Sequence, residues 1–363
     1  MNHRTYLTLA IPLTISTMTT PLLGAVDTAV VGQLSAPAYI AGVAVGTLIF
    51  NTLYWVFGFL RVSTSAFAAQ ANGASDPDQG VLALSRPFLL ALIVGVLFIL
   101  LQWPIEHTAL LVISPDAEVT AFILGLFIIL KVSPFKWKMP SIQTLIDTNS
   151  TKRMFNVNKD LFIRTICLLV VINMFTAKGA SFGTEFLAAN AVLFQIHYIM
   201  AYFFDGFANA SSILVGKAVG SNDKELFKKT LTLSRQWSII TAVIIASLYV
   251  LFQKQVIGLF TNLPDVIELS LTYGVWLIIY PFVACFGLVL YGVFTGATEI
   301  APVRNSMIYA MVVYIIIQIT ATPIWHNHGL WLAFIIYTIG RSGFLVMYTP
   351  RLNKKLVELK GEG

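Results

Sequence analysis

The chain has 363 residues, of which 57% are hydrophobic and only 11% are charged, and its mean hydropathy is +0.80. Soluble domains carry roughly a quarter charged residues, so this composition excludes a soluble globular protein and predicts an all-α polytopic membrane protein. The formal net charge is +6. It comes mainly from the loops between apolar segments, so it gives no reason to expect a nucleic-acid partner.

The apolar residues fall into segments of the length that a membrane-spanning helix requires. A bilayer core about 30 Å thick is crossed by about 20 residues of helix. Nine full-length candidates follow in chain order: Leu7–Val31, Ala38–Leu60, Pro87–Trp103, Leu161–Phe175, Phe186–Val215, Leu231–Phe252, Val266–Val293, Val303–Ile324 and Leu330–Tyr348. A tenth segment, Val119–Val132, is too short for an ordinary crossing.

The distribution of Lys and Arg between these segments predicts the orientation, because the cytoplasmic loops of membrane proteins are rich in these residues. Three stretches are basic: residues 136–159, 217–235 and 351–360. Four stretches are short and poor in basic residues: 106–118, 178–185, 253–265 and 326–329. The two kinds alternate only if the short tenth segment also crosses. We therefore expect about ten transmembrane helices, with both termini in the cytoplasm.

The sequence also contains an internal repeat. Ala41–Asp76 aligns with Ala188–Asp223 without a gap, and the two copies end in QANGASD and KAVGSND. Each copy has the pattern of a long helix that runs inward to a Gly and an acidic turn. Both copies point the same way, so we predict a parallel repeat with a pseudo-axis along the membrane normal, as in transporters built from two halves.

Several stretches resemble the multidrug and toxic compound extrusion (MATE) transporters, and within them the DinF-like branch. They are residues 21–32 (PLLGAVDTAVVG), 157–165 (VNKDLFIRT), 194–207 (FQIHYIMAYFFDGF), 296–299 (GATE) with 304–307 (RNSM), and 329–331 (GLW) with Arg341. The resemblance implies a two-lobe helix bundle in the bacterial inner membrane. It also implies export of organic cations or drug-like amphiphiles in exchange for protons or sodium, with no cofactor beyond the coupling ion.

The chain departs from the twelve-helix pattern of these transporters. Residues 1–135 would form a shortened first lobe with three full helices and the short segment, and residues 136–158 a basic cytoplasmic linker. Residues 159–350 would form a complete six-helix lobe, followed by a cytoplasmic tail at 351–363. Near residues 121–126, a stretch that resembles the start of the family's fourth helix is followed directly by a stretch that resembles the end of its sixth helix. We therefore expect two helices of the first lobe to be missing.

Asp27 is the leading candidate for ion coupling. It lies about 12 Å of helix inside the outer end of its segment, where a carboxylate is costly to insert and can gain and lose a proton during turnover. It also matches the first-helix carboxylate of the resembling family. The structural alternative is a carboxylate satisfied by helix ends or by a Lys. Pro12, in the same segment, can kink the helix and so gate the cavity.

Asp205 is the second acid inside an apolar segment, and the second candidate for ion coupling. It lies about 18 Å of helix from the inner boundary. Arg164 lies just inside the inner end of its own segment, and its long side chain could reach this acid. A structural Arg164–Asp205 ion pair and a role of Asp205 in ion or substrate coupling both remain open.

A polar and aromatic stripe precedes Asp205 on the same segment. Gln195, Tyr198 and Tyr202 recur at helical spacing, with His197 beside them, so these residues could line a substrate cavity. Packing is the alternative for each of them. The remaining candidates are Asn51 and Asn173 for the cavity, and Arg61, Glu299 and Arg304 for gating or structure. Glu299 and Arg304 flank a cytoplasmic turn, where we expect a solvated or locking ion pair.

The sequence leaves three classes of function to compare. It has no His-Glu-x-x-His pair, nucleophile elbow or phosphate loop, so we expect neither an enzyme nor a metal site. A flippase for lipids or lipid-linked sugars would have a basic cavity, whereas the basic residues here lie mainly in loops, which favours a cationic or neutral cargo. An inactive or partner-dependent truncated transporter is the other alternative, because the missing helices complete the pocket around Asp27 in the resembling family. The oligomeric state is not predicted.

Overall fold

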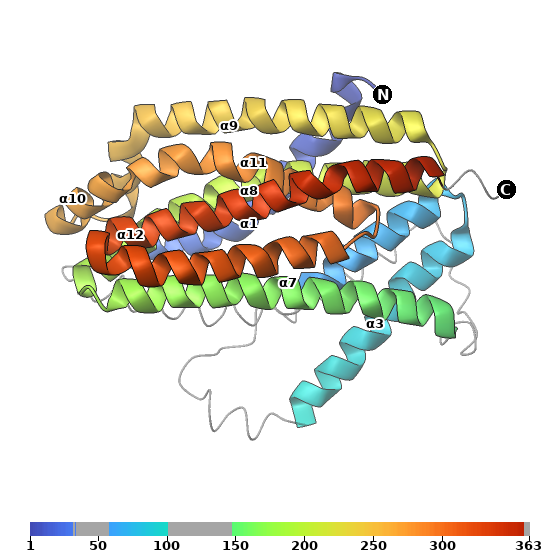
Figure 1. The fold of residues 1–363 in the computed structure, drawn as a ribbon, viewed down its shortest axis with the longest axis horizontal. Coiled ribbons are helices and arrows are strands. Elements are labelled where there is room, and N and C mark those ends of the chain that lie inside the picture. The colour runs from blue at the N-terminus through green and yellow to red at the C-terminus, as the bar shows by residue number, and fades with distance from the viewer. Residues whose placement is uncertain (32, 34–57, 101–146, 359–363) are drawn as a thin grey trace.

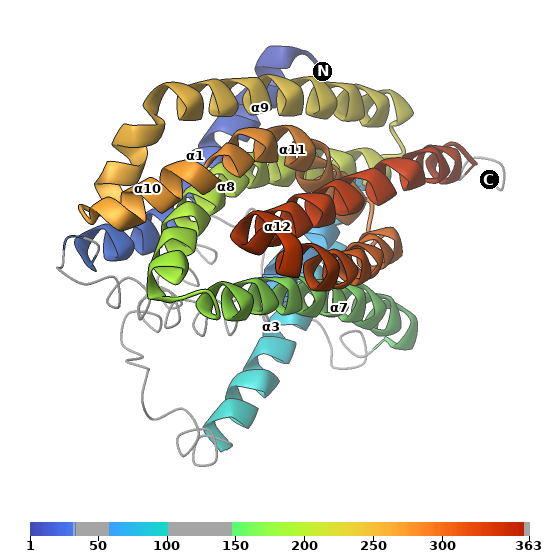
Figure 2. The same ribbon diagram turned by 60° about the vertical axis from the view of Figure 1, so that its left-hand side comes forward.

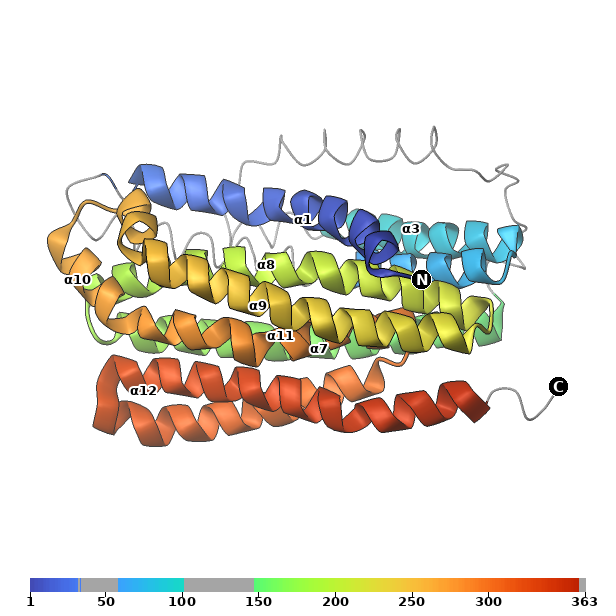
Figure 3. The same ribbon diagram turned by 90° about the horizontal axis from the view of Figure 1, so that it is seen from above.

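The protein is a bundle of long α-helices that run side by side along one axis (Figures 1 and 3). The computed structural model describes residues 1–31, 33, 58–100 and 147–358, and no strand occurs among them. The helices with defined bounds are α1 (His3–Val31), α3 (Pro77–Leu100), α7 (Thr148–Ala180), α8 (Thr184–Gly220), α9 (Lys224–Phe260), α10 (Pro264–Tyr273), α11 (Val275–Gly296) and α12 (Ala301–Glu358). Residues 58–73 are also helical.

Within the described ranges, six helices are long and apolar enough to cross a membrane. The last of them, α12, is two helices joined at His326, whose backbone angles of φ 47° and ψ −126° are not helical. The chain reverses there (Figure 3), as the separate segments Val303–Ile324 and Leu330–Tyr348 predict. Most of the expected helix Ala38–Leu60 and all of the short segment Val119–Val132 lie outside the described residues.

One predicted segment is wrong. Val266–Val293 is not a single helix, because the chain divides at Gly274 into α10 and α11. The cause is contact with α9: a Cβ atom at position 274 would overlap the Gln253 side chain and come within 2.7 Å of the Tyr249 hydroxyl. The junction is tightened by an i to i+3 hydrogen bond, in which the Leu277 amide donates to the Gly274 carbonyl at 3.0 Å.

The start of α1 and the end of α12 lie toward the same end of the bundle (Figure 3). We call this the basic end, and define it by the turns at residues 74–76, 221–223 and 297–300 together with the first turns of α7. The opposite end carries the turns at residues 181–183 and 261–263 and the reversal at His326.

The two copies of the repeat finish in the same turn at the basic end. Ser75 and Asn222, at equivalent positions, both adopt the left-handed conformation, with φ of 56° and 54°. In the next helix the Asp76 carboxylate accepts a hydrogen bond from the Gln79 amide at 3.0 Å. The Asp223 carboxylate accepts one from the Leu226 amide at 2.9 Å. Each Asp therefore caps the helix that follows, and the predicted acidic turn is confirmed in both copies.

The helix α8 lies at the centre of the bundle, between α1, α9 and α11 (Figure 2). Its apolar side chains are mostly buried, whereas α9 presents a row of exposed large hydrophobic residues on its outer face, namely Ile239, Ile240, Val243, Ile244, Leu248 and Leu251. An outer face of this kind is expected where lipid, rather than water, surrounds the protein.

Small residues allow α8 and α11 to approach closely. A Cβ atom at Gly292 or Gly296 of α11 would overlap the carbonyl oxygen of Ala208 or Ser212 on α8. Glycines at this spacing are a common device for packing membrane helices. The close approach places the C-terminal half of α11 beside the segment of α8 that carries Asp205.

Candidate functional site

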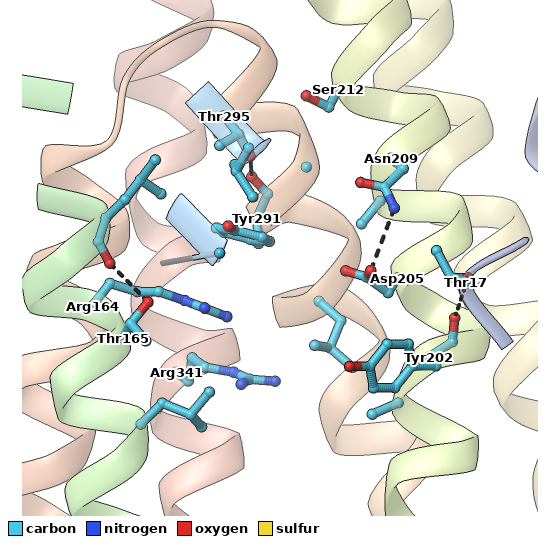
Figure 4. Close-up of a pocket in the computed structure, with 18 of the residues that line it drawn as sticks. Thr17, Arg164, Thr165, Tyr202, Asp205, Asn209, Ser212, Tyr291, Thr295 and Arg341 are labelled. Atoms are coloured by element: carbon cyan, nitrogen blue, oxygen red, sulfur yellow. Dashed lines mark hydrogen bonds between the residues drawn. The ribbon is translucent and has the colours of Figure 1, made fainter. Parts of the chain in front are cut away.

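A cavity of about 360 Å³ opens inside the bundle (Figure 4). Its described walls come from α1, the helix over residues 58–73, α7, α8, α11 and α12. Its volume lies within the range of about 300–1,000 Å³ that is typical of small-molecule sites. Because five of these six helices are long and apolar enough to cross a membrane, this cavity is the candidate site.

Asp205 projects into the cavity from α8 and is half-buried. Asn209, one helical turn further along, donates a hydrogen bond to its Oδ2 atom at 3.4 Å. The guanidinium groups of Arg61 and Arg164 act on Asp205 electrostatically. Asp205 is the one acid among the described residues that line the cavity.

Arg164 enters the cavity from α7 on the side opposite Asp205 (Figure 4). Its guanidinium carbon lies 4.6 Å from the centre of the Tyr291 ring, which is a cation–π contact. Within the described part of the chain, no ion pair of 4.0 Å or less joins Arg164 to Asp205. The direct Arg164–Asp205 pair considered from the sequence is therefore absent, because the guanidinium lies over Tyr291 instead.

Arg341 is a site residue that sequence reasoning noted only as part of a family resemblance. It lines the cavity from the second half of α12 (Figure 4), and only 8% of it is exposed. Its Nε atom has no hydrogen-bond partner in the described structure, and its guanidinium carbon lies 6.0 Å from the centre of the Tyr337 ring. The signal that could have identified it is an Arg in the middle of the apolar segment Leu330–Tyr348, where a charge is costly and usually functional.

The predicted aromatic stripe is divided between the cavity and the core. His197, Tyr198 and Tyr202 line the cavity. Gln195 is only 6% exposed and lies against α1, where a Cβ atom at Gly24 would come within 3.4 Å of its Oε1. Three of the four stripe residues therefore face the candidate site, and Gln195 packs between two helices.

The first-lobe candidates are only partly described. Position 27 lies in α1, but the Asp27 side chain is outside the described residues, and so is Asn51. Pro12 lies on the exposed side of α1, which remains helical through it. Arg61 lines the cavity.

Two other candidates lie away from the cavity. The Asn173 side chain is exposed, and it donates a hydrogen bond to the Leu169 carbonyl of its own helix at 2.8 Å. Arg304, expected beside Glu299, forms an ion pair with Asp160 of α7, with Nη1 and Oδ1 separated by 2.6 Å.

Side chains from three elements meet at the basic end of the bundle. The Gln70 Nε2 atom donates to the Gly296 carbonyl at 2.8 Å. Arg153 Nη2 donates to Thr298 Oγ1 at 2.8 Å and to Gln70 Oε1 at 3.3 Å. We call Gln70, Arg153 and Thr298 the basic-end latch, because they join the helix over residues 58–73 to α7 and to the α11–α12 turn.

A cavity with charged side chains, enclosed by apolar helices of membrane-spanning length, is the arrangement of a membrane transporter. The MatE family model matches residues 12–136 and 162–321. The chain therefore belongs to the MATE family, which makes it a multi-pass membrane transporter and not an enzyme. In bacteria, such transporters lie in the inner membrane.

Two curated relatives and one solved structure agree with this assignment. The chain is 28% identical over 404 residues to DNA damage-inducible protein F of Escherichia coli K12, covering 91% of this chain and 88% of that protein. It is 24% identical over 148 residues to the probable multidrug resistance protein YoeA of Bacillus subtilis 168, covering 41% of this chain and 31% of that protein. The crystal structure of an aspartate-to-asparagine mutant of the Vibrio cholerae MATE transporter VcmN superposes with a TM-score of 0.81 at 13% identity, covering 97% of each chain.

The alignment with the Escherichia coli protein has more positions than this chain has residues, 404 against 363. The relative therefore has residues that this chain lacks.

Proposed function

We propose that this chain is a secondary active exporter of amphiphilic small molecules, driven by the entry of protons or sodium. The observation that carries the proposal is the cavity itself, which combines charged and aromatic walls inside a bundle of apolar helices. Its basic end would face the cytoplasm, because Lys and Arg are retained on that side.

In this proposal the substrate and the coupling ion occupy different places. The substrate lies in the cavity, and Asp27 on α1 takes up the coupling ion. The helix α1 connects the two, because Leu13, Ser16 and Thr17 line the cavity and Thr17 Oγ1 donates a hydrogen bond to the Tyr202 carbonyl of α8 at 3.2 Å. Asp205 is the second candidate for coupling.

Alternating access would open the cavity to one side of the membrane at a time. The basic-end latch supports this mechanism, since Gln70 binds the Gly296 carbonyl, next in sequence to the lining residue Thr295. Releasing the latch would open the cytoplasmic side, and re-forming it would commit the substrate to the outer side.

The test uses purified protein in lipid vesicles with an imposed pH or sodium gradient and a panel of fluorescent amphiphiles. We expect gradient-dependent movement by the natural chain and its loss in Asp27→Asn. Asp205→Asn is assayed in parallel, and Asp78→Asn is the matched control because Asp78 is exposed in the first turn of α3. Equal gradient dependence in all four proteins would overturn coupling by these acids. A folded natural chain that moves nothing would instead support the truncated, inactive alternative.

A flippase for lipids or lipid-linked sugars is the second candidate function. One observation favours it: Arg61, Arg164 and Arg341 line the cavity, whereas the sequence analysis expected the basic residues to lie mainly in loops. Transfer of a fluorescent lipid between the leaflets of the same vesicles distinguishes this activity from export of a water-borne molecule.

A further inference from the structure

The charges that line the cavity do not balance. Among the described lining residues, Arg61, Arg164 and Arg341 carry positive charge and Asp205 alone carries a negative one. A buried charge is expensive unless an opposite charge or hydrogen bonds satisfy it. The described part of the lining is therefore short of negative charge on the side formed by α7 and α12.

Arg341 is the residue for which this shortage is greatest. It is 8% exposed and its Nε atom is unpartnered. It interacts with the Tyr280 and Tyr337 side chains, but these are neutral and so are weak substitutes for an anion. An unsatisfied buried donor on a guanidinium costs more than one on a neutral group. By contrast, the fold provides Arg304 with a carboxylate partner, Asp160.

Arg164 and Arg341 approach the cavity from neighbouring helices and extend in the same direction, toward α8 (Figure 4). Two guanidinium groups that extend into one cavity in the same direction can donate several N–H bonds to the oxygens of one carboxylate, sulfonate or phosphate. Arg164 is held in place by the Tyr291 ring, so little side-chain freedom remains to be lost on binding.

The rest of the lining suits the apolar part of a ligand. Tyr198, Tyr280, Phe334 and Tyr337 contribute ring faces, and Leu168 and Ile172 contribute aliphatic side chains. Aromatic and aliphatic walls around a few converging polar groups are typical of sites for amphiphilic molecules.

We propose that the cavity binds anionic amphiphiles, with the acidic head held by Arg164 and Arg341 and the apolar body against the rings of α8, α11 and α12. This inference rests on the proposed export function and names its substrate class. It replaces the cationic cargo that the basic loops favoured. Asp205 lies across the cavity from the two arginines, so it repels the ligand head rather than binding it.

The position of Asp205 gives a test in which the binding affinities for an anionic and a cationic ligand change in opposite directions. Replacing Asp205 by Asn removes a negative charge from the cavity, which strengthens the binding of an anion and weakens the binding of a cation. Replacing Arg341 or Arg164 by Gln has the opposite effects.

Binding is measured in phosphatidylcholine nanodiscs with two probes that share a dansyl group and an undecyl chain, one ending in a carboxylate and the other in a trimethylammonium group. The natural chain should bind the carboxylate probe at least about tenfold more tightly, which corresponds to about 1.4 kcal/mol. Arg341→Gln and Arg164→Gln should each weaken that binding about tenfold, and Asp205→Asn should strengthen it. Arg351→Gln is the matched control, because Arg351 is exposed near the end of α12 and lies outside the lining.

Preferred binding of the ammonium probe, or unchanged carboxylate binding in both Arg variants, would overturn the proposal. Thermal unfolding of each variant in detergent separates lost binding from lost folding, and the half-buried Arg164 provides a second variant if Arg341→Gln does not fold. Carboxylate binding without transport would retain this substrate class and reject active export. Gradient-driven transport of the ammonium probe alone would support active export and reject this substrate class.

Competition identifies the source of the acidic head. Displacement of the carboxylate probe by water-soluble dodecyl phosphate, but not by phosphatidic acid incorporated into the nanodisc, would support a free amphiphile. Displacement by phosphatidic acid would support a lipid head that enters from the bilayer. Displacement by neither, at concentrations far above that of the probe, would overturn recognition of the anionic head.

Discussion

Arg304 at the start of α12 forms an ion pair with Asp160 of α7, 144 positions earlier in the chain, with 2.6 Å between Nη1 and Oδ1. The Arg304 Nε and Nη2 atoms also donate to the Asn305 side chain, at 3.1 and 2.9 Å. The side chains of Asp160 and Arg304 are 12% and 27% exposed. The pair therefore connects two helices at the basic end in surroundings that shield it from water.

We expect Asp160→Asn to lower the free energy of unfolding by about 1–3 kcal/mol, between the values typical of exposed and of buried ion pairs. Thermal or denaturant unfolding of the purified protein in detergent measures the change. Exchanging the charges, with Asp160→Arg and Arg304→Asp together, should recover part of the loss.

The matched control is Lys229→Gln, which removes the exposed Lys229–Glu225 pair on α9. Exposed pairs of this spacing contribute only about 0.3–0.5 kcal/mol. If Lys229→Gln destabilised the protein as much as Asp160→Asn, the Asp160–Arg304 pair would have no special role.

The two ends of the repeat touch through a reciprocal contact of backbones. A Cβ atom at Gly73 would overlap the Lys217 carbonyl, and one at Gly220 would overlap the Gln70 carbonyl. We expect Gly73→Ala and Gly220→Ala each to destabilise the protein by about 1–3 kcal/mol, because a helix must move away. Gly258→Ala should be neutral or slightly stabilising, since nothing lies within 4 Å of its added Cβ. Equal effects in all three variants would contradict the close approach.

A buried amide pair joins α8 to α12 near the opposite end. Asn190 and Asn327 exchange hydrogen bonds of 2.9 and 3.1 Å, and Trp331 Nε1 donates to Asn190 Oδ1 at 2.9 Å. Asn190→Leu leaves two buried donors without a partner, so we expect a loss of about 1–3 kcal/mol in unfolding free energy. Adding Asn327→Leu should restore part of it. Asn173→Ala, an exposed position, is the control, and an equal loss there would contradict the assignment.

Breaking the basic-end latch should open the cavity. We expect Gln70→Ala to increase several-fold the rate at which a membrane-impermeant maleimide labels Ser212→Cys, in a background where Cys167 and Cys285 are replaced by Ala. Ser212 lines the cavity and is only 7% exposed. Gln79→Ala, at an exposed position in the first turn of α3, should leave the rate unchanged. An unchanged rate in Gln70→Ala would show that the latch does not close this mouth.

Features set by neighbouring residues could be predicted from the sequence. The turns after Gly73 and Gly220 follow from a local pattern, in which a left-handed residue is followed by an Asp that caps the next helix. The reversal at His326 follows from the interruption between two apolar segments. Apolar length also identifies the helices, and the acid Asp205 inside such a length identifies one wall of the cavity.

Features set by distant residues could not be predicted. The division at Gly274 depends on Tyr249 and Gln253 of another helix, and the partner of Arg304 is 144 positions away. The basic character of the cavity could not be predicted for the same reason. Arg164 and Arg341 belong to different segments, and nothing in either segment indicates that the two side chains line the same cavity.

The exchange of hydrogen bonds between Asn190 and Asn327 has a consequence for how this chain can vary. Both residues and Trp331 belong to residues 147–358, and none of their mutual bonds needs a residue of the first lobe. The position of α8 relative to α12 is thus determined by residues that all lie within residues 147–358. Insertions and deletions before residue 147 can therefore leave the registration of α8 with α12 intact.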